Sequence, residues 1–239
     1  MLAGCSARPA LEDAPQSLTT RDGVVLVGHA YLPSQANPPG LVLIHGAGAD
    51  RHRWESFAAR AQQWGYLALT VDLRGHGESA VESGPYAHHR QFSDGEWHST
   101  ALDIDAALGR LQTLGAAPED LFLVGEGFGA NLALDYARTH RDVQGIVLLS
   151  AGKTYHGLEA DVLMAELRTR PSLLLWSERD DYAAATGSSL QRVAPGHVEV
   201  RVYPGTAFGA DIFDRAPESV GQVLVWLDQM RAKPAPPTL

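Results

Sequence analysis

The stretch Leu121–Asn131, which reads L-F-L-V-G-E-G-F-G-A-N, decides the fold of this chain. It opens with a continuous apolar run, which is typical of a strand buried on both faces of a sheet. Glycine then occurs at alternate positions, Gly125, Gly127 and Gly129, and helical spacing follows from Phe128 to Thr139. Because glycine permits tight turns and close backbone contacts, the stretch predicts a strand that turns directly into a helix.

The glycine spacing matches the nucleophile elbow, G-x-S-x-G, in which a strained turn lifts a serine above a parallel sheet. The middle position of this sequence is Gly127. The chain is therefore predicted to keep the turn without the hydroxyl that the motif presents. Glycine adopts such a backbone conformation with little strain, whereas a residue with a Cβ incurs about 1–3 kcal/mol.

On either side of this stretch, segments with strand and helix patterns alternate along the chain. Asp22-Gly23 separates two segments and predicts an antiparallel N-terminal hairpin. The predicted strands are Ser17–Thr20, Val24–Tyr31, Leu41–Ile44, Tyr66–Leu73, Asp120–Gly125, Val143–Ser150, Ser172–Ser177 and His197–Tyr203. The predicted helices are His52–Trp64, Thr100–Leu114, Phe128–Thr139, Glu159–Arg170, Tyr182–Val193 and Pro217–Met230. This alternation indicates an α/β fold, a mostly parallel sheet of about eight strands with helices on both faces.

The domain organisation follows from the same pattern. Residues 17–231 are predicted to form one domain, after a flexible tether at 1–16 and before a Pro-rich, disordered tail at 232–239. Between the Val143 and Ser172 strands there is room for one helix, so only a minimal cap is expected. In such sheets ligands bind beyond the carboxyl ends of the strands, where the informative residues of this chain also occur.

Composition narrows the range of functions. The net charge of −9 argues against a nucleic-acid surface, which needs clustered Lys and Arg. The single cysteine excludes an internal disulfide and a Cys-based zinc site. The histidines of the polar loop 74–98 lack the spacing of a compact metal motif, so neither a metal nor a cofactor is expected.

The N-terminal segment Leu2-Ala3-Gly4-Cys5 is similar to a bacterial lipobox, in which the cysteine is lipidated. A secretory signal would need basic and apolar regions upstream, where only Met1 stands, so the start could be truncated or the match incidental. Two interpretations stay open. The protein is a cell-envelope lipoprotein that contacts membrane only through a lipid on Cys5, or a cytoplasmic protein with an incidental cysteine.

Five segments in register resemble the α/β-hydrolase superfamily, over about Ser17 to Met230. They are the oxyanion loop H-G-x-G, the D-x-R-G-x-G-x-S segment, the elbow, the acid loop and the loop that usually carries a histidine. In this sequence they are His45-Gly46-Ala47-Gly48, Asp72–Ser79, Gly125–Gly129, Ser177–Asp180 and Tyr203–Gly209. The resemblance implies an α/β-hydrolase fold of the small, lidless esterase type.

The resemblance also implies where a Ser-Asp-His triad would lie, because the three residues follow one another in that order. Carried over position by position, they become Gly127, Asp180 and Phe208. Only the acid, Asp180, is retained, since glycine offers no nucleophile and phenylalanine cannot shuttle a proton. Loss of either triad serine or histidine costs about 10⁶ in turnover in a well-studied protease. The triad is therefore interpreted as degenerate.

Three functions are compatible with these residues. The first is a catalytically inactive hydrolase homologue that binds a small molecule or a protein through a pocket formed by the oxyanion loop, Glu126, Phe128 and His156. The second is a hydrolase of ester or amide bonds that uses Asp180, Glu126 or His156 as a base. The third is an anchored structural or interaction domain without a ligand.

Overall fold

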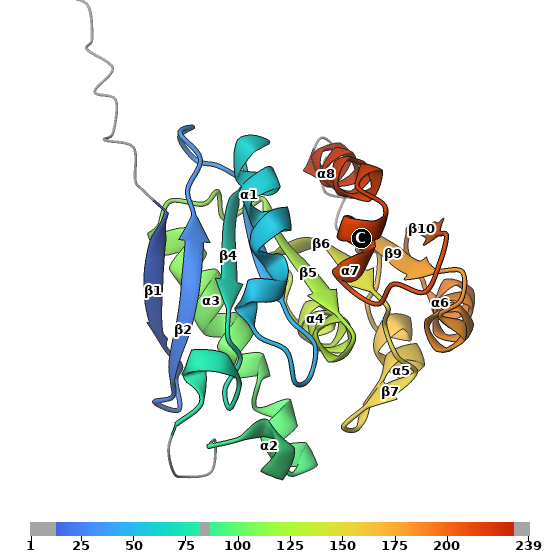
Figure 1. The fold of residues 1–239 in the computed structure, drawn as a ribbon, viewed down its shortest axis with the longest axis horizontal. Helices are drawn as coiled ribbons and strands as arrows, with labels where there is room; N and C mark the ends of the chain where they lie inside the picture. Colours follow the sequence, from blue (N-terminus) through green and yellow to red (C-terminus); the bar gives the residue numbers. More distant parts are fainter. Residues whose placement is uncertain (1–12, 82–86, 232–239) are drawn as a thin grey trace, which may run out of the picture.

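The computed structural model describes residues 13–81 and 87–231, so Cys5 with most of the predicted tether, and the tail 232–239, lie outside the described residues. An eight-stranded sheet has the order β1-β2-β4-β3-β5-β6-β9-β10 (Figure 1). These strands are β1 (Ala14–Thr19), β2 (Val25–Tyr31), β3 (Gly40–Ile44), β4 (Leu67–Val71), β5 (Leu121–Glu126), β6 (Val143–Leu149), β9 (Ser172–Ser177) and β10 (Val198–Tyr203). A separate hairpin consists of β7 (Thr154–Tyr155) and β8 (Leu158–Glu159).

The sheet is mostly parallel. Only β2 runs antiparallel to its neighbours β1 and β4, whereas all pairs from β4 to β10 are parallel. The carboxyl ends of the parallel strands therefore meet at one edge of the sheet, where a ligand site is expected. This topology confirms the predicted α/β-hydrolase fold with its N-terminal hairpin.

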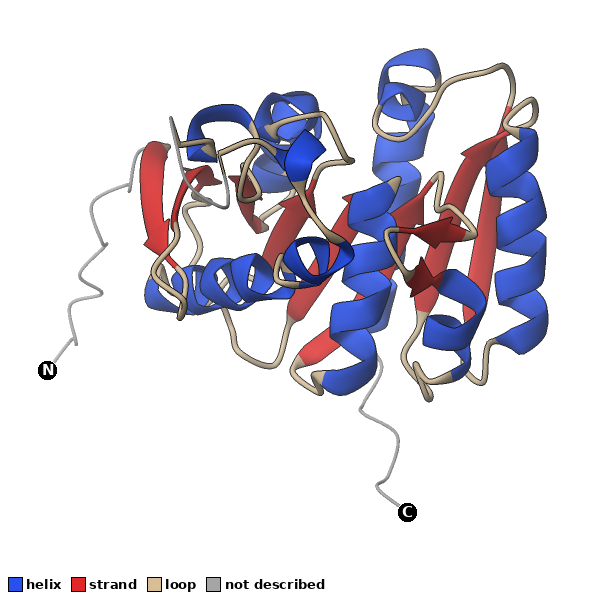
Figure 2. Cartoon of the chain, turned by 90° about the horizontal axis from the view of Figure 1, so that it is seen from below, coloured by secondary structure: helices blue, strands red, loops and turns tan. Residues whose placement is uncertain are grey.

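Helices cover both faces of the sheet (Figure 2). The α-helices are α1 (Glu55–Gln63), α2 (Asp94–His98), α3 (Ala101–Thr113), α4 (Phe128–Thr139), α5 (Ala160–Ala165), α6 (Asp181–Val193), α7 (Asp211–Arg215) and α8 (Glu218–Arg231). The helices α3, α4, α5 and α6 bury their apolar side chains in one core, and α1, α7 and α8 in the other. Short 3₁₀ turns are η1 (Arg51–Trp54), η2 (Gly77–Ser79) and η3 (His89–Gln91).

Five segments differ from the sequence predictions. β1 begins at Ala14 rather than Ser17, so residues 14–16 belong to the sheet and not to the tether. The predicted helix Glu159–Arg170 is only α5, which is followed by a backbone with positive φ at Arg168. The loop 74–98 ends in α2, whose N-terminus carries a capping box between Ser93 and Glu96. The helix α7 and the β7–β8 hairpin were not predicted.

The segment after β4 ties this end of the sheet together. Asp72 is buried and accepts hydrogen bonds from the backbone N–H groups of Arg51 (2.7 Å) and Glu78 (2.9 Å). Arg74 is also buried, and its guanidinium donates to Asp103 and Asp22. Because both buried charges are paired and hydrogen-bonded, the segment holds a fixed shape beside the oxyanion loop.

Candidate functional site

The turn at Gly127 has the strained geometry that the glycine spacing predicts. Gly127 links β5 to α4 with φ 53° and ψ −118°, a conformation that residues with a Cβ rarely adopt. A Cβ on Gly125 would lie 2.2 Å from the carbonyl oxygen of Gly129, and one on Gly129 would lie 2.4 Å from that of Ile44. The outer glycines are therefore required by backbone contacts, and the helix packs directly behind the turn.

The ring of Phe208 lies over the elbow. A Cβ built on Gly127 would be 3.1 Å and 3.3 Å from two ring carbons of Phe208, and 4.0 Å from the Cα of Gly46. The Phe208 side chain is 41% exposed, so it borders solvent as well as the turn. The structure thus brings Gly127, Phe208 and the oxyanion loop together at the carboxyl edge of the sheet.

The loop that carries Phe208 is held by hydrogen bonds to neighbouring strands. The Ser177 hydroxyl donates to the carbonyl of Ala207 (2.7 Å), and the Gly209 N–H donates to the Ser150 hydroxyl (3.1 Å). Ser150 is buried and has a positive φ of 46°. Its hydroxyl therefore anchors the loop after β10, and no imidazole or carboxylate contacts it among the hydrogen bonds of the described residues.

Asp180 caps the helix α6. Its Oδ1 accepts a hydrogen bond from the Ala183 N–H (3.0 Å), as an N-cap residue does. Its Oδ2 is buried and has no hydrogen-bond partner among residues 13–81 and 87–231. A buried oxygen without a donor destabilises the fold by about 1–3 kcal/mol. The retained acid thus has one structural bond and one oxygen without a donor.

The oxyanion loop is fixed by His45. This fully buried imidazole donates from Nδ1 to the Gly46 carbonyl (2.8 Å) and accepts at Nε2 from the Leu73 N–H (3.0 Å). Burial lowers the pKa of His45, which keeps the ring neutral as these two bonds require. His45 is therefore a clamp between the loops after β3 and β4, and both ring nitrogens are occupied.

Two backbone amides, next to the elbow in sequence or in the motif, donate no hydrogen bond within residues 13–81 and 87–231. In the motif, the oxyanion is bound by the N–H of the residue after the nucleophile and by an N–H of the β3 loop. These correspond to Phe128 and Ala47, and neither N–H donates a hydrogen bond to the described residues. Gly48, with φ 77°, completes the turn of the loop. The N–H groups at these two positions thus have no acceptor among the described residues.

Glu126 is a buried bridge between two loops. Its Oε2 accepts from the Ala210 N–H (2.7 Å), and its Oε1 lies 3.4 Å from the Gly46 nitrogen and 3.3 Å from the Nε of Arg53. Burial opposes the charged form of Arg53, but hydrogen bonds to Glu126 and Asp211 raise the pKa of Arg53 above its ordinary value. Both oxygens of the Glu126 carboxylate therefore take part in structural contacts next to the elbow.

The candidate base His156 belongs to an aromatic cluster. Its ring stacks on Trp97 at 4.1 Å between centroids with an interplanar angle of 8°, and meets the edge of Phe128 at 5.8 Å. Burial lowers the pKa of His156. The side chain is therefore near the first residue of α4, but it stacks on an indole and no carboxylate hydrogen bonds to it among the described residues.

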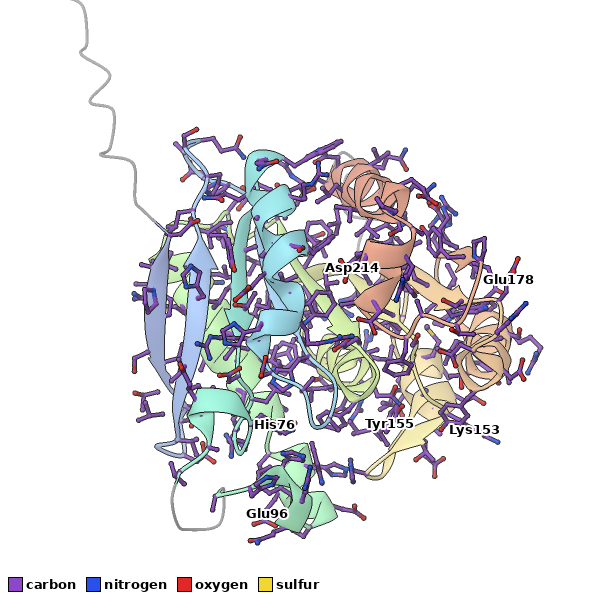
Figure 3. The ribbon with its side chains drawn as sticks, viewed as in Figure 1. His76, Glu96, Lys153, Tyr155, Glu178 and Asp214 are labelled. Carbon is purple, nitrogen blue, oxygen red and sulfur yellow. The ribbon has the colours of Figure 1, made fainter. Side chains whose placement is uncertain are left out.

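The loop histidines stack on one another. His76 and His89 lie 4.0 Å apart with an interplanar angle of 10°, and burial together with neighbouring imidazoles lowers the pKa of His76 to about 3. Figure 3 shows His76 and Tyr155 in the lower half of the molecule, on the side toward which β4 and β5 run, and Glu96 of α2 further below. Within residues 13–81 and 87–231, no group of three or more His, Cys, Asp or Glu side chains has the arrangement of a metal site.

Two cavities flank the loop of Phe208 on the side of α7. One, of about 600 Å³, is lined by Phe208, Thr206, Asp211 and Asp214. The other, of about 340 Å³, is lined by Arg53, Glu55, Asp211 and Phe213. The two share acidic side chains of α7, including Asp214 (Figure 3). The cavities beside the loop of Phe208 thus have polar walls.

Sequence comparison identifies the family of this fold. The profile of the serine aminopeptidase S33 family matches residues 37–170, which is more than half of the chain. The chain belongs to this family. The matched region includes the oxyanion loop and the elbow, and ends before Asp180 and Phe208.

Known proteins similar to this chain include lipases and esterases. A thermostable monoacylglycerol lipase from Bacillus sp. (strain H-257) is 25% identical over 127 residues, which cover 53% of this chain and 46% of the lipase. The match thus spans about half of the length of this curated relative. A carboxyl esterase from Bacillus coagulans, in complex with glycerol, superposes with a TM-score of 0.73 at 14% identity, covering 92% of this chain and 99% of the esterase. Dienelactone hydrolase from Anabaena variabilis gives a TM-score of 0.71 at 18% identity, covering 92% and 96%.

Several contacts of this family member were not predicted from its sequence. Arg53 binds Glu126 across 73 residues of chain, and Ser150 binds the loop after β10 across 59 residues. Neither contact has a local pattern, because each depends on how distant strands are ordered in the sheet. The motif Ser93-x-x-Glu96 before α2 was a local signal that predicts a helix start. No helix in the described part of the chain is long and apolar enough to cross a membrane.

Proposed function

We propose that this chain is a catalytically inactive hydrolase homologue that binds its ligand at the elbow and leaves ester and amide bonds intact. The observation that carries the proposal is the position of the Phe208 ring, which lies where a side chain at position 127 would extend. The elbow offers no side chain at 127, and an aromatic ring, which cannot accept a proton, lies over the position where a nucleophile would extend. Acyl transfer needs both a nucleophile and a base within hydrogen-bond reach of it.

Each alternative base has a structural contact, although the Oδ2 of Asp180 has no hydrogen-bond partner among the described residues. Glu126 binds Arg53 and the Ala210 amide, Asp180 caps α6, and His156 stacks on Trp97. A carboxylate beside the elbow would also repel a developing oxyanion. The second hypothesis, hydrolysis through one of these residues, therefore gains no support from the contacts of the site.

The ligand is expected to present an oxygen to the elbow. The amides of Phe128 and Ala47 have no partner among the described residues, and Phe128 begins a helix whose N-terminal dipole favours partial negative charge. The exposed part of Phe208 adds an apolar wall on one side. A neutral carbonyl group attached to an apolar body fits these features, and a homologue of lipases and esterases would retain them from its catalytic relatives.

The proposal is tested by chemistry that the native protein should lack. The purified protein is incubated with a fluorophosphonate and with p-nitrophenyl butyrate, and neither covalent labelling nor hydrolysis above the buffer rate is expected. The double variant Gly127→Ser with Phe208→His, compared with Gly127→Ser alone, is then expected to gain fluorophosphonate labelling. Stoichiometric labelling of the native protein, or ester turnover that Glu126→Gln or His156→Phe abolishes, would refute the proposal.

A further inference from the structure

β10 forms one edge of the sheet. It pairs with β9 on one side and has no neighbour on the other among the described strands (Figure 1). Its register with β9 runs from Val198 to Tyr203 without a bulge, and the strand contains neither proline nor glycine. β1, at the opposite edge, carries Pro15. An edge without proline or bulge is a template for another strand.

The outward-facing backbone groups belong to the valines of β10. The Ser172 N–H donates to the carbonyl of His197 and the Glu178 N–H donates to that of Tyr203, so the odd-numbered residues bond to β9. Because alternate residues of a strand face opposite neighbours, the N–H and C=O groups of Val198, Val200 and Val202 point away from the sheet. The Val200 carbonyl accepts a hydrogen bond from Nη1 of Arg201 in the same strand (3.0 Å), which a further strand would replace. With that exchange, the three residues can pair with a further strand.

The charges of β10 select both the partner and the register. Glu199 and Arg201 lie on either side of Val200 and carry opposite charges. Within one copy they form an ion pair with each other (2.9 Å), which pairing with a second copy would exchange for ion pairs between the copies. If two copies of the strand pair antiparallel around Val200, each Glu199 lies opposite the Arg201 of the other copy. Opposite charges across a strand pair are stabilising, and like charges are destabilising. An axis at Glu199 or Arg201 would instead place identical charges opposite each other.

We propose that two copies of this chain associate through β10, as antiparallel strands with a two-fold axis at Val200. In this register Val200 pairs with itself and Val198 pairs with Val202 of the second copy. Each such pair exchanges two backbone hydrogen bonds, which gives about six across the interface. The contact is isologous and closed, so it makes a dimer and not a fibre.

The surface beside the edge has space for the second copy. A depression of about 300 Å³ lies between Arg201 and the face of α8 that includes Gln222 and Val225. Val202 is 47% exposed and Val225 is 44% exposed, so apolar surface borders the strand on this side. Pairing of the two strands brings the corresponding surfaces of the two copies toward each other and buries part of this apolar area.

Disulfide cross-linking tests the axis directly. In a Cys5→Ser background, Val200→Cys is expected to form a disulfide-linked dimer under mild oxidation, because paired residues on the axis have Cα atoms about 5.5 Å apart, within disulfide range. Val202→Cys is the matched control. Its two copies would lie about 14 Å apart along the strands, too far for a disulfide, although the side chain is more exposed. Absence of the Val200→Cys dimer, or equal cross-linking of Val202→Cys, would overturn the proposal.

Charge reversal tests the register in the protein without introduced thiols. Sedimentation of a dilution series is expected to show a monomer–dimer equilibrium, which Glu199→Arg weakens at least about tenfold by placing like charges opposite each other. Glu199→Arg with Arg201→Glu exchanges the charges and is expected to restore the dimer. Glu119→Arg, on an exposed loop, makes the same charge change as a control. A monomer at every concentration, or a dimer indifferent to Glu199→Arg, would contradict the register.

Discussion

The substitution Gly127→Ala adds a methyl group at the elbow and tests whether the backbone there is strained for a residue with a Cβ. Its φ of 53° and ψ of −118° impose about 1–3 kcal/mol of strain on any residue with a Cβ. The new Cβ would also lie 3.1 Å from the ring of Phe208, which must yield by a few tenths of an ångström. Because the ring is partly exposed, it can move, and backbone strain is the larger cost.

An opposing effect acts through the unfolded chain. Replacement of glycine by alanine stabilises a protein by about 0.4–1 kcal/mol where the native backbone accepts it. The net destabilisation expected for Gly127→Ala is therefore about 0.5–2 kcal/mol. For a chain of this size, each kcal/mol changes the melting temperature by about 2–4 °C, so the expected decrease is about 1–8 °C.

A second glycine of the same chain supplies the control. Gly109 lies within α3, and a Cβ there would have no neighbour within 4 Å. Gly109→Ala is expected to raise the free energy of unfolding by about 0.5–1 kcal/mol, the opposite sign. The assay is urea unfolding of both variants and of Gly127→Ala with Phe208→Ala, which separates ring contact from backbone strain. A Gly127→Ala variant as stable as Gly109→Ala would show that the elbow is not strained.

Two further predictions concern the buried polar groups of the site. Glu126→Ala leaves the buried N–H of Ala210 without its acceptor. In urea unfolding, this substitution is expected to lower the free energy of unfolding by about 1–3 kcal/mol. The control Glu178→Ala, at an exposed position, should change the free energy of unfolding by less than about 0.5 kcal/mol. His76, with its pKa lowered from 6.5 to about 3, stays neutral in the folded protein while the unfolded chain binds a proton. Its contribution to stability is complete above about pH 6.5 and is lost as the pH falls toward 3. The free energy of unfolding, measured by urea titration, should decrease between pH 7 and pH 4.5 by about 2 kcal/mol less in His76→Gln than in the native protein. Equal decreases in the two proteins would contradict burial of His76 as the cause.

The parts of the fold that the sequence predicts well are those controlled by local sterics. The alternate glycines predicted the turn and the start of α4. At Gly125 and Gly129, glycine is required because backbone atoms from within a few residues or from one neighbouring strand approach too closely for a Cβ. The boundaries of α4 and of β9 agree with prediction. The long helix predicted at Glu159–Arg170 failed because Arg168 adopts a positive φ, which residue type alone does not indicate.

The composition of the site was less predictable than its location. Gly127, Phe208 and the oxyanion loop were expected at one edge of the sheet, and the structure brings them into contact. The bridge from Arg53 to Glu126 was not expected, because it joins η1 to β5 through a side chain whose direction depends on tertiary packing. From the sequence alone, a carboxylate next to the elbow is therefore interpreted as available for chemistry, although in the folded protein it is paired with a cation from a distant segment.

The three glycines of the elbow have different surroundings, and these surroundings determine at which of the three positions a side chain can be accommodated. At Gly125 and Gly129 any side chain would collide with main-chain atoms of neighbouring segments, whereas at Gly127 it meets only the tip of one movable ring. Natural or laboratory evolution can therefore introduce a reactive group at the centre of the turn through codon changes at 127 and 208, without rebuilding the scaffold.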